Sequence, residues 1–357
     1  MSKLNLKSQL TSTWNDRFQD VSKLNDYART HPVELSDVKI EKQNIDGAVL
    51  NGAQFHNTDW KSVSVKKANL TKTIFRQGTL DSVDFSNSTL TDVVFENVRL
   101  VEVRFFHTTL VNVRFVHCTF NGSNIDQTKT SNIEVIDSRV INTSLSEGQL
   151  VAVFRNSQLY KGTSLTDLQP PSSLTFEESD LDDVDLSRSV LSDLVLDTVK
   201  SNNSGFITGS VRSVVITGGD ISFGFSETRI DSLKVHNINS VGLALDDAVV
   251  KTMTFSNCRE MSSLNLFRAK IGTLDFINCS PNNFRPRVAN INTLRIKDGT
   301  ISNSKLEKMK AKTVILDNVS LSGELNFTDA HIGDLKTKNV TKQPGLKLII
   351  DGSNVKL

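Results

Sequence analysis

Long hydrophobic runs are missing from this 357-residue chain, and so is an excess of charge of either sign. No apolar stretch approaches the roughly 20 residues of a membrane span, and no charged-then-apolar signal segment opens the chain. The 41 basic and 40 acidic residues leave a net charge of +1, so no global field favours nucleic acid or an anionic membrane. We expect no membrane span and no direct nucleic-acid binding. The localisation is unknown, cytoplasmic by default, with a secreted effector or a trimmed exported form as alternatives.

A pair of apolar or small residues, two positions apart, recurs at steps close to twenty residues down almost the whole chain. Successive members are Thr73/Phe75, Val93/Phe95, Val113/Phe115 and Ile133/Val135, and the series continues to Leu335/Thr337. Self-similarity at a fixed period of this size predicts a repeat architecture.

Within each twenty residues there is a finer beat of five, as in Leu70, Phe75, Leu80, Phe85 and Leu90. An α-helix repeats every 3.6 residues and a strand every two, so a beat of five predicts a short extended segment followed by a tight corner. Four such sides make one coil. The sequence therefore predicts an all-β solenoid, a parallel β-helix of about 15–16 coils of about 20 residues each, in which coils contact only their neighbours.

This pattern resembles the pentapeptide-repeat family over roughly residues 33–340. The favoured motif A-[D/N]-L-x-x stands at Ala68-Asn69-Leu70, and related forms stand at Ser179-Asp180-Leu181 and Val184-Asp185-Leu186. The resemblance implies a right-handed quadrilateral β-helix. Val, Thr or Leu often replaces the small residue, which indicates a divergent member. A pectate-lyase-like β-helix with longer, more variable coils is the alternative.

The two ends depart from the beat of five, and we assign residues 1–32 to an N-terminal helical cap, 33–340 to the β-helix and 341–357 to a C-terminal cap or last strand. One apolar helical stripe consists of Leu10, Trp14, Phe18, Val21, Leu24 and Ala28. We expect this helix to cover the first coil, because open edges of a β-helix must be covered; a partner-binding helix is the alternative. A second departure, the proline-rich interval 165–174, predicts a protruding corner.

Cysteine is scarce, and the three present, Cys118, Cys258 and Cys279, fall at small inward positions of the repeat. We expect them to be buried as small hydrophobes. Cys258 and Cys279 should lie on adjacent coils, where a disulfide is sterically conceivable. The six histidines have no histidine or cysteine one coil away. We therefore predict no catalytic residues, no metal site, no cofactor and no enzymatic activity.

The densest group of carboxylates follows the proline-rich interval, and all of its members sit at outward positions. It consists of Glu177, Glu178, Asp180, Asp182, Asp183 and Asp185. We interpret this acidic patch as a solvated band. A binding patch is one alternative, and calcium binding by Asp182, Asp183 and Asp185 is another, because calcium takes oxygen ligands.

One inward column changes character late in the chain, where Ser240, Glu260 and Pro281 take the place of large apolar residues. An unpaired carboxylate is costly to bury, so the wall should either bulge or open into a polar pocket. We predict a binding groove here, with a bulged corner that binds nothing as the alternative. The groove would be lined by Asn239, Arg259, Glu260, Asn282, Asn283 and Arg285.

The long regular surface and the lack of a convergent catalytic set favour a non-enzymatic scaffold that engages another macromolecule, most simply a protein, through a lateral face. One alternative is a carbohydrate-active or carbohydrate-binding β-helix. Another, taken from the family resemblance, is a DNA-mimicking inhibitor or protector of gyrase, which the basic C-terminal region disfavours. The resemblance also implies binding modules, including bacterial effectors delivered into host cells, and a homodimer through residues 320–357.

Overall fold

The computed structural model describes residues 20–238, 240–258 and 260–356 and divides the chain into two compact units, Met1–Leu165 (unit 1) and Thr166–Leu357 (unit 2). Each unit is a parallel β-solenoid, with about 15 turns in all and one short N-terminal helix. The fold class predicted from the sequence is confirmed. The boundary between the units falls inside the proline-rich interval 165–174. The assignment of a single β-helical region over residues 33–340 stays a prediction.

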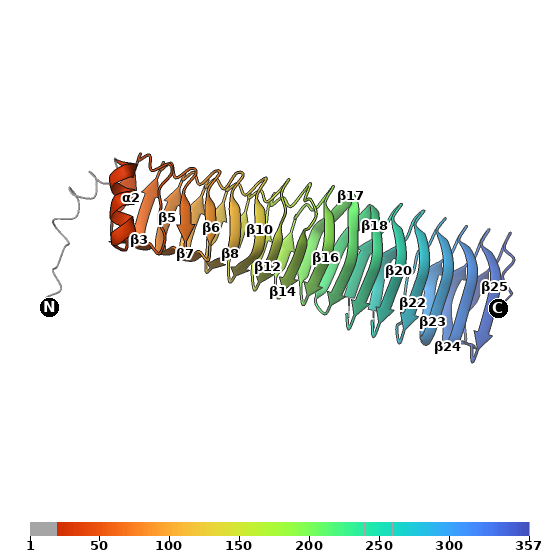
Figure 1. The fold of residues 1–357 in the computed structure, drawn as a ribbon. Helices are drawn as coiled ribbons and strands as arrows, with labels where there is room; N and C mark the ends of the chain where they lie inside the picture. Colours follow the sequence, from red (N-terminus) through yellow and green to blue (C-terminus); the bar gives the residue numbers. More distant parts are fainter. Residues whose placement is uncertain (1–19, 239, 259, 357) are drawn as a thin grey trace. The chain divides into compact units, whose positions relative to one another are not determined.

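Unit 1 begins with a helix that is followed by short parallel strands, and Figure 1 shows these strands side by side in sequence order. Its elements are α2 (Val21–Thr30), β1 (Glu34–Ser36), β2 (Lys39–Glu41), β3 (Gln54–Lys61), β4 (Asn69–Thr71), β5 (Ile74–Asp81), β6 (Thr89–Thr91), β7 (Val94–Val101), β8 (Thr109–Val116), β9 (Thr119–Asn121), β10 (Lys129–Ile136), β11 (Arg139–Ile141), β12 (Val151–Arg155) and β13 (Gln158–Tyr160).

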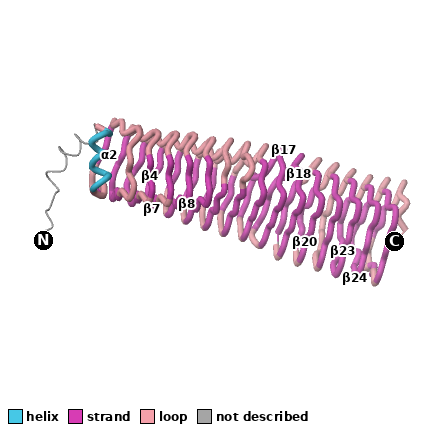
Figure 2. Tube along the Cα trace, viewed as in Figure 1, coloured by secondary structure: helices cyan, strands magenta, loops and turns pink. Residues whose placement is uncertain are grey.

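Unit 2 has longer strands, several of which continue through a corner of the coil. Figure 2 shows the loops of each unit confined to short turns between strands. The elements are β14 (Ser173–Glu177), β15 (Asp180–Asp182), β16 (Val190–Asp197), β17 (Lys200–Thr217), β18 (Asp220–His236), β19 (Ser240–Ala244), β20 (Val249–Ser256), β21 (Glu260–Asn265), β22 (Lys270–Ile277), β23 (Asn290–Lys305), β24 (Lys310–Asn326), β25 (His331–Lys338), β26 (Thr341–Lys342) and β27 (Lys347–Ile349).

The core of unit 1 is a stack of aromatic rings, because the register pairs each residue with the one a coil later. Phe55 pairs with Phe75, Phe75 with Phe95, and Phe95 with Phe115. Their ring centroids are 4.8, 5.0 and 4.8 Å apart in the same order. This spacing is the distance between neighbouring strands in a sheet, so the rings stack along the axis of the unit.

The small inward position carries buried hydroxyl groups whose hydrogen bonds hold neighbouring coils together. The hydroxyls of Thr73, Ser88 and Thr108 donate to the carbonyl oxygens of Leu50, Val65 and Phe85, at 2.7, 2.8 and 2.9 Å. Each bond therefore reaches 23 residues back along the chain. A buried hydroxyl without a partner would destabilise the core, so this repeated bond explains why Ser and Thr replace alanine in so many repeats.

The corners need a residue in the left-handed region, and one occurs about once per five residues. Asn57, Asn87 and Asn97 have φ values of 50, 60 and 56°. Asn, Asp and Gly tolerate this conformation best, which explains the many asparagines of the repeat. Stacked corners also bond to one another: the Asn112 amide donates to Asp92 (2.9 Å), and the Asn132 amide donates to Asn112 (3.1 Å).

Helix α2 covers the first coil, as expected, within the part that is described. Its Leu24 is fully buried. The side-chain amide of Asn25 accepts from the Val49 amide at 2.7 Å and donates to the Gly47 carbonyl at 3.1 Å, which pairs backbone groups of the first coil. Asp20 caps the helix by accepting from Ser22 and Lys23. Leu10, Trp14 and Phe18 of the predicted stripe lie outside the described residues.

Candidate functional site

In most coils of unit 2, two residues form each corner and the second of them is left-handed. At the corner that follows β15, these residues are Asp182 and Asp183, and one coil later they are Asn202 and Asn203; Asp183 has a φ of 58° and Asn203 a φ of 50°. The protruding pair separates two inward residues and lets the backbone turn sharply. Corners of this kind form a continuous ridge when they stack.

Two successive coils are one residue short at this ridge. In the first coil, only Ser222 separates the inward residues Ile221 and Phe223. In the next coil, Val241 pairs with Ile221 and Leu243 pairs with Phe223, and only Gly242 lies between them. Neither corner residue has a positive φ, and strand β18 runs through its corner without interruption. The missing residues leave a notch in the ridge, with a cavity volume of about 710 Å³.

The floor of the notch consists of the smallest side chains at outward positions. Gly205 pairs with Gly224, and Gly224 pairs with Ala244. Gly224 has no atom within 4 Å of the place where a Cβ would stand, so nothing but open space lies above it. Asp185 precedes this column and Asn265 follows it, each joined by backbone pairing.

The two ends of the notch are lined by different polar groups. The exposed carboxylates of Asp183 and Asp185 line one end. Asp183 accepts from the amide of Asn203 at 3.1 Å, and Asp185 accepts from the backbone N–H of Ser187 at 2.8 Å. At the other end the Asn265 amide donates to Asp246 at 2.8 Å and accepts from the Phe267 N–H. The notch therefore offers a carboxylate end and an amide end, both held in place by hydrogen bonds.

The acidic patch predicted from the sequence is spread over several faces. None of its six members is buried, but only Asp183 and Asp185 line the notch. Asp182 instead accepts from Asn202 at 3.1 Å. Among the residues that the structure describes, no group of three or more His, Cys, Asp or Glu side chains is placed to hold a metal ion. The roles proposed for the patch stay predictions.

The inward column bulges here, which is one of the two outcomes expected from the sequence, because the register shifts by one residue between Ser240 and Gly242. Ser240 pairs with the exposed Asp220, and Glu260 pairs with Ser240, so the backbone places both in an outward column. The inward place beside Pro281 belongs to Met261, whose side chain is buried. Two residues rather than one separate Cys258 from Met261. Because of this extra residue, counting in steps of five assigned Glu260 instead of Met261 to the inward column.

The residues of the predicted groove are only partly within the described chain. Asn239 and Arg259 lie outside the described residues, as does the side chain of Glu260. Asn282 accepts from the Asn303 amide at 3.2 Å, and Arg285 donates to Asn283 at 2.9 Å. These contacts lie one coil beyond Asn265 and outside the notch lining. Binding by this set stays a prediction.

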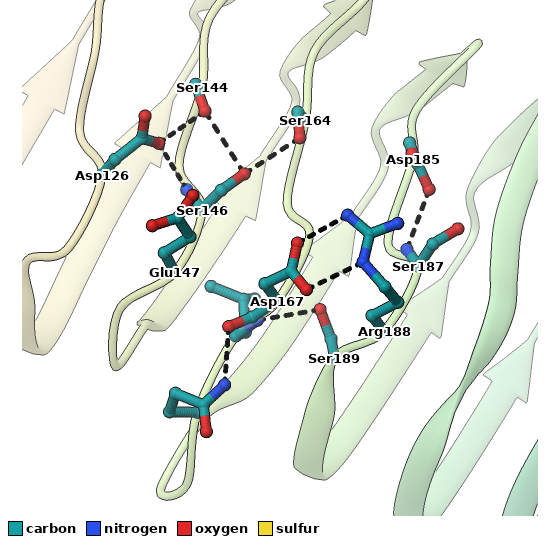
Figure 3. A network of polar contacts seen from close by, with 12 residues as sticks. Asp126, Ser144, Ser146, Glu147, Ser164, Asp167, Asp185, Ser187, Arg188 and Ser189 are labelled. Atoms are coloured by element: carbon teal, nitrogen blue, oxygen red, sulfur yellow. Dashed lines mark hydrogen bonds and ion pairs between the residues drawn. The ribbon is translucent and has the colours of Figure 1, made fainter.

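Other polar clusters join neighbouring coils, and Figure 3 shows one from each unit. In unit 1, Asp126 accepts from the Ser144 hydroxyl at 2.5 Å and from the Ser146 N–H at 2.8 Å. In unit 2, Arg188 donates twice to Asp167, at 2.8 and 2.6 Å. These hydrogen bonds hold the pKa of Asp167 below its ordinary value. Such exposed pairs between coils are structural contacts of modest strength.

The three cysteines are buried, as predicted, and are free thiols. Burial raises the pKa of the Cys118 thiol to about 12. Its sulfur donates to the Phe95 carbonyl at 3.4 Å, the same 23-residue step that the buried hydroxyls use. The Cys258 N–H donates to the Cys279 sulfur at 3.3 Å, which confirms their place on adjacent coils. Their burial fits structural thiols rather than reactive ones.

The glycine floor was not predicted from the sequence, although the sequence holds a signal for it. The segment from Ile221 to Phe225 alternates inward and outward residues with a period of two, where the repeat elsewhere inserts a two-residue corner. Glycine at the outward place of such an alternation, as in Gly224, leaves the outer face bare. The signal for the notch in the sequence is a segment of strict alternation that interrupts the five-residue beat.

The coils, the aromatic stack and the left-handed corners define the class of protein, a parallel β-helix built on five-residue repeats. Residues 68–145 match the family described as "Pentapeptide repeat region". The resemblance predicted from the sequence is therefore confirmed, and the family match covers this stretch of the chain.

Seventeen chains of solved structures match this one. One is HetL, a pentapeptide repeat protein involved in heterocyst differentiation regulation in the cyanobacterium Nostoc sp. strain PCC 7120, with 13% identity, a TM-score of 0.28 and coverage of 93% of this chain and 95% of HetL. Another is QnrB1, a plasmid-mediated fluoroquinolone resistance protein, with 14% identity, a TM-score of 0.23 and coverage of 68% of this chain and 92% of QnrB1. No curated protein matches the sequence. Within the described ranges, the chain contains no helix with the length and hydrophobicity of a membrane span.

Proposed function

We propose that this chain is a non-enzymatic scaffold that binds a partner protein through the notch of unit 2. The observation that supports the proposal is the paired shortening of two corners above a floor of Gly205, Gly224 and Ala244. A solenoid gains stability when each strand carries β-branched or aromatic residues, and glycine weakens a strand. A larger side chain would fit at Gly224. That glycine stands there instead supports a role in which the floor stays open to a partner.

The chemistry of the notch favours an extended segment with a basic side chain. A floor without large side chains lets a partner backbone approach closely. The Asp183 and Asp185 carboxylates, both exposed and both oriented by hydrogen bonds, complement a lysine or arginine of that segment. Charges of this kind raise association rates and select partners more than they add affinity.

The test fills the notch without disturbing the fold. Immobilised wild-type protein and Gly224→Lys are used to capture proteins from a lysate of the source cells, with quantitative comparison of what each retains. Thr254→Lys is the matched control, because it adds the same charge at an outward position of β20 that lies outside the notch. We expect Gly224→Lys to lose a partner that the wild type and the control retain, with a dissociation constant weakened by about tenfold or more.

A second pair of variants tests the charge. Asp183→Asn with Asp185→Asn should slow association at low ionic strength, because screening removes the effect of exposed charges in salt. Glu177→Gln with Glu178→Gln removes the same charge outside the notch lining. Equal retention of every captured protein by Gly224→Lys and by wild type would contradict the proposal.

We also propose that two copies associate through residues 320–357. This region ends in strands β26 and β27, which pair with β24, and the neighbouring Ile350 is 49% exposed. An exposed apolar side chain beside these strands favours contact with a second chain.

A further inference from the structure

A second surface of unit 2, separate from the notch, carries uncompensated positive charge. We call it the basic face. It consists of five exposed cations on strands β18, β20, β22 and β24 and their flanking corners: Arg229, Lys251, Lys270, Lys310 and Lys312. Backbone pairing aligns Arg229 with Val249, Val249 with Lys270, Lys270 with Asn290, and Asn290 with Lys310. The five cations therefore lie along one lateral face, on four of five successive coils, over a length of roughly 20 Å.

These cations lack the partners that other cations of unit 2 possess. Arg212 bonds to Asp193 at 3.1 Å, and Arg268 bonds to Asp247 at 2.5 Å. Within the part of the chain that the structure describes, none of the five cations of the basic face has a carboxylate oxygen within 4.0 Å of its nitrogen atoms, and none has a hydrogen bond from its side chain. An aligned series of free cations creates a local positive field even where the net charge of the chain is near zero.

The basic face is also hollowed, with a cavity of about 370 Å³. Three of its cations, Arg229, Lys251 and Lys270, line this cavity, together with a single described carboxylate, Asp231. Gly272 also lines the cavity, and the backbone requires glycine there, because a Cβ would stand 2.4 Å from the Lys251 carbonyl oxygen. Val249 contributes an apolar surface that is 41% exposed.

Neutral hydrogen-bonding groups stand beside the cations. Asn290 and Asn292 line the same cavity. A column of threonines runs along the neighbouring edge, and pairing places Thr252, Thr273, Thr293 and Thr313 on successive coils. Each threonine hydroxyl can donate and accept. The face thus combines positive charge on four of its five coils with a regular series of threonine hydroxyl groups and two asparagine amides.

We propose that the basic face binds a linear acidic polysaccharide of the polyuronate type. Such a polymer carries one carboxylate per sugar, and its sugar repeat is close to the separation of neighbouring coils. Its carboxylates can therefore meet Arg229, Lys251 and Lys270 on three successive coils and the lysines of β24 two coils further along. The hydroxyls of each sugar fit the threonine and asparagine side chains, and Val249 fits the apolar side of a sugar ring. This surface and its ligand are independent of the notch proposed above.

Nucleic acid fits the same face less well. Single-stranded nucleic acid binds through aromatic side chains that stack with bases, and the lining of this cavity contains no aromatic residue. Duplex DNA presents a far denser line of charge, one per about 1.7 Å, which coils about 4.8 Å apart cannot match. An acidic protein has no reason to place its carboxylates at the coil spacing.

The experiment measures binding of the full chain to polygalacturonate by affinity electrophoresis and titration calorimetry at low ionic strength. We expect binding by the wild type that weakens about tenfold in the triple variant Arg229→Gln, Lys251→Gln, Lys270→Gln, since each exposed ion pair contributes modestly. The control Lys234→Gln, Lys305→Gln, Lys308→Gln removes the same charge from other faces and should leave binding within about twofold. Methyl-esterified polygalacturonate should not bind.

Three results would overturn the proposal: no binding of polygalacturonate by the wild type, equal loss in the control variant, or equal affinity for an oligothymidylate or for polyglutamate. The last result would identify an unselective site for polyanions. Circular dichroism melting of both triple variants checks that the fold is intact. The notch is untouched in these variants, so failure here leaves the capture experiment with Gly224→Lys unaffected.

Discussion

At the scale of single residues, two neighbouring glycines of the notch floor are small for different reasons. A Cβ on Gly205 would lie 2.4 Å from the Gly224 carbonyl oxygen, so the backbone itself requires glycine there. A Cβ on Gly224 would meet nothing within 4 Å, and its φ is not positive. The fold therefore tolerates a side chain at Gly224, and only the shape of the notch argues against one.

This difference predicts opposite effects of alanine at the two glycines. Gly224→Ala should raise the free energy of unfolding by about 0.5 kcal/mol, because alanine reduces the freedom of the unfolded chain. Gly205→Ala should lower it by more than about 1 kcal/mol, since the new methyl group collides with backbone. Urea denaturation followed by circular dichroism measures both. A loss of stability in Gly224→Ala would show that the open floor is structurally required.

The small inward position of the repeat shows which structural features could be predicted from the sequence and which could not. The beat of five was sufficient to predict that Cys118 faces the core, and the structure buries it together with Thr73 and Ser88. The bond from each of them to a carbonyl 23 residues earlier depends on the distance between coils, which no local pattern reveals. The asparagines are likewise evident in the sequence, but the sequence alone did not show that they form the left-handed corners.

At the scale of elements, helix α2 acts as a lid whose polar contacts matter as much as its apolar stripe. Asn25 satisfies both the N–H of Val49 and the carbonyl of Gly47 at the open edge of the first coil. At the other end of the chain Asn354 contacts Ile332 in the same two-bonded way, at 2.9 and 2.8 Å. Each terminal coil described here thus has an asparagine that replaces part of the missing neighbouring strand.

The cap predicts a local effect of Asn25→Ala. Loss of the side-chain amide leaves the Val49 N–H, which is partly buried, without its partner, and we expect a loss of roughly 1–2 kcal/mol in the free energy of unfolding. The Val49 amide should exchange its hydrogen faster than the amides of β5. Asp26→Ala, at the next and exposed position of the helix, is the control. Unchanged exchange at Val49 in Asn25→Ala would contradict the role of the cap.

Strands β17, β18, β23 and β24 show why the candidate site was not predicted while the fold was. In these strands, 16 to 18 residues long, the extended backbone passes through a corner, so the count from one inward residue to the next changes locally. A shift of one residue moves a side chain to the opposite face of a strand. Beside β21 the extra residue between Cys258 and Met261 has the same effect, so a strict count of five puts Glu260 in the inward column although the global period of twenty was right.

At the scale of the whole molecule, the spacing of residues in the sequence determines how they are arranged on the surface. Residues about twenty apart stack within a unit, so outward residues at multiples of that spacing fall in one column, as Arg229, Lys270 and Lys310 do on alternate coils of the basic face. An interruption of the repeat produces a hollow, as at Ser222 and Gly242. Binding surfaces on such a scaffold can thus arise without any change in the core.

The proposed homodimer is testable through its most exposed apolar side chain. Ile350, 49% exposed beside β27, should be covered in the dimer, and Ile350→Lys should shift the protein from dimer to monomer in sedimentation velocity at micromolar concentration, because a buried unpaired charge opposes association. Ile277→Lys introduces the same charge at a similarly exposed position, 42%, away from residues 320–357. We expect this control to remain dimeric. A wild-type protein that sediments as a monomer, or a dimer that persists in Ile350→Lys, would exclude association through this end.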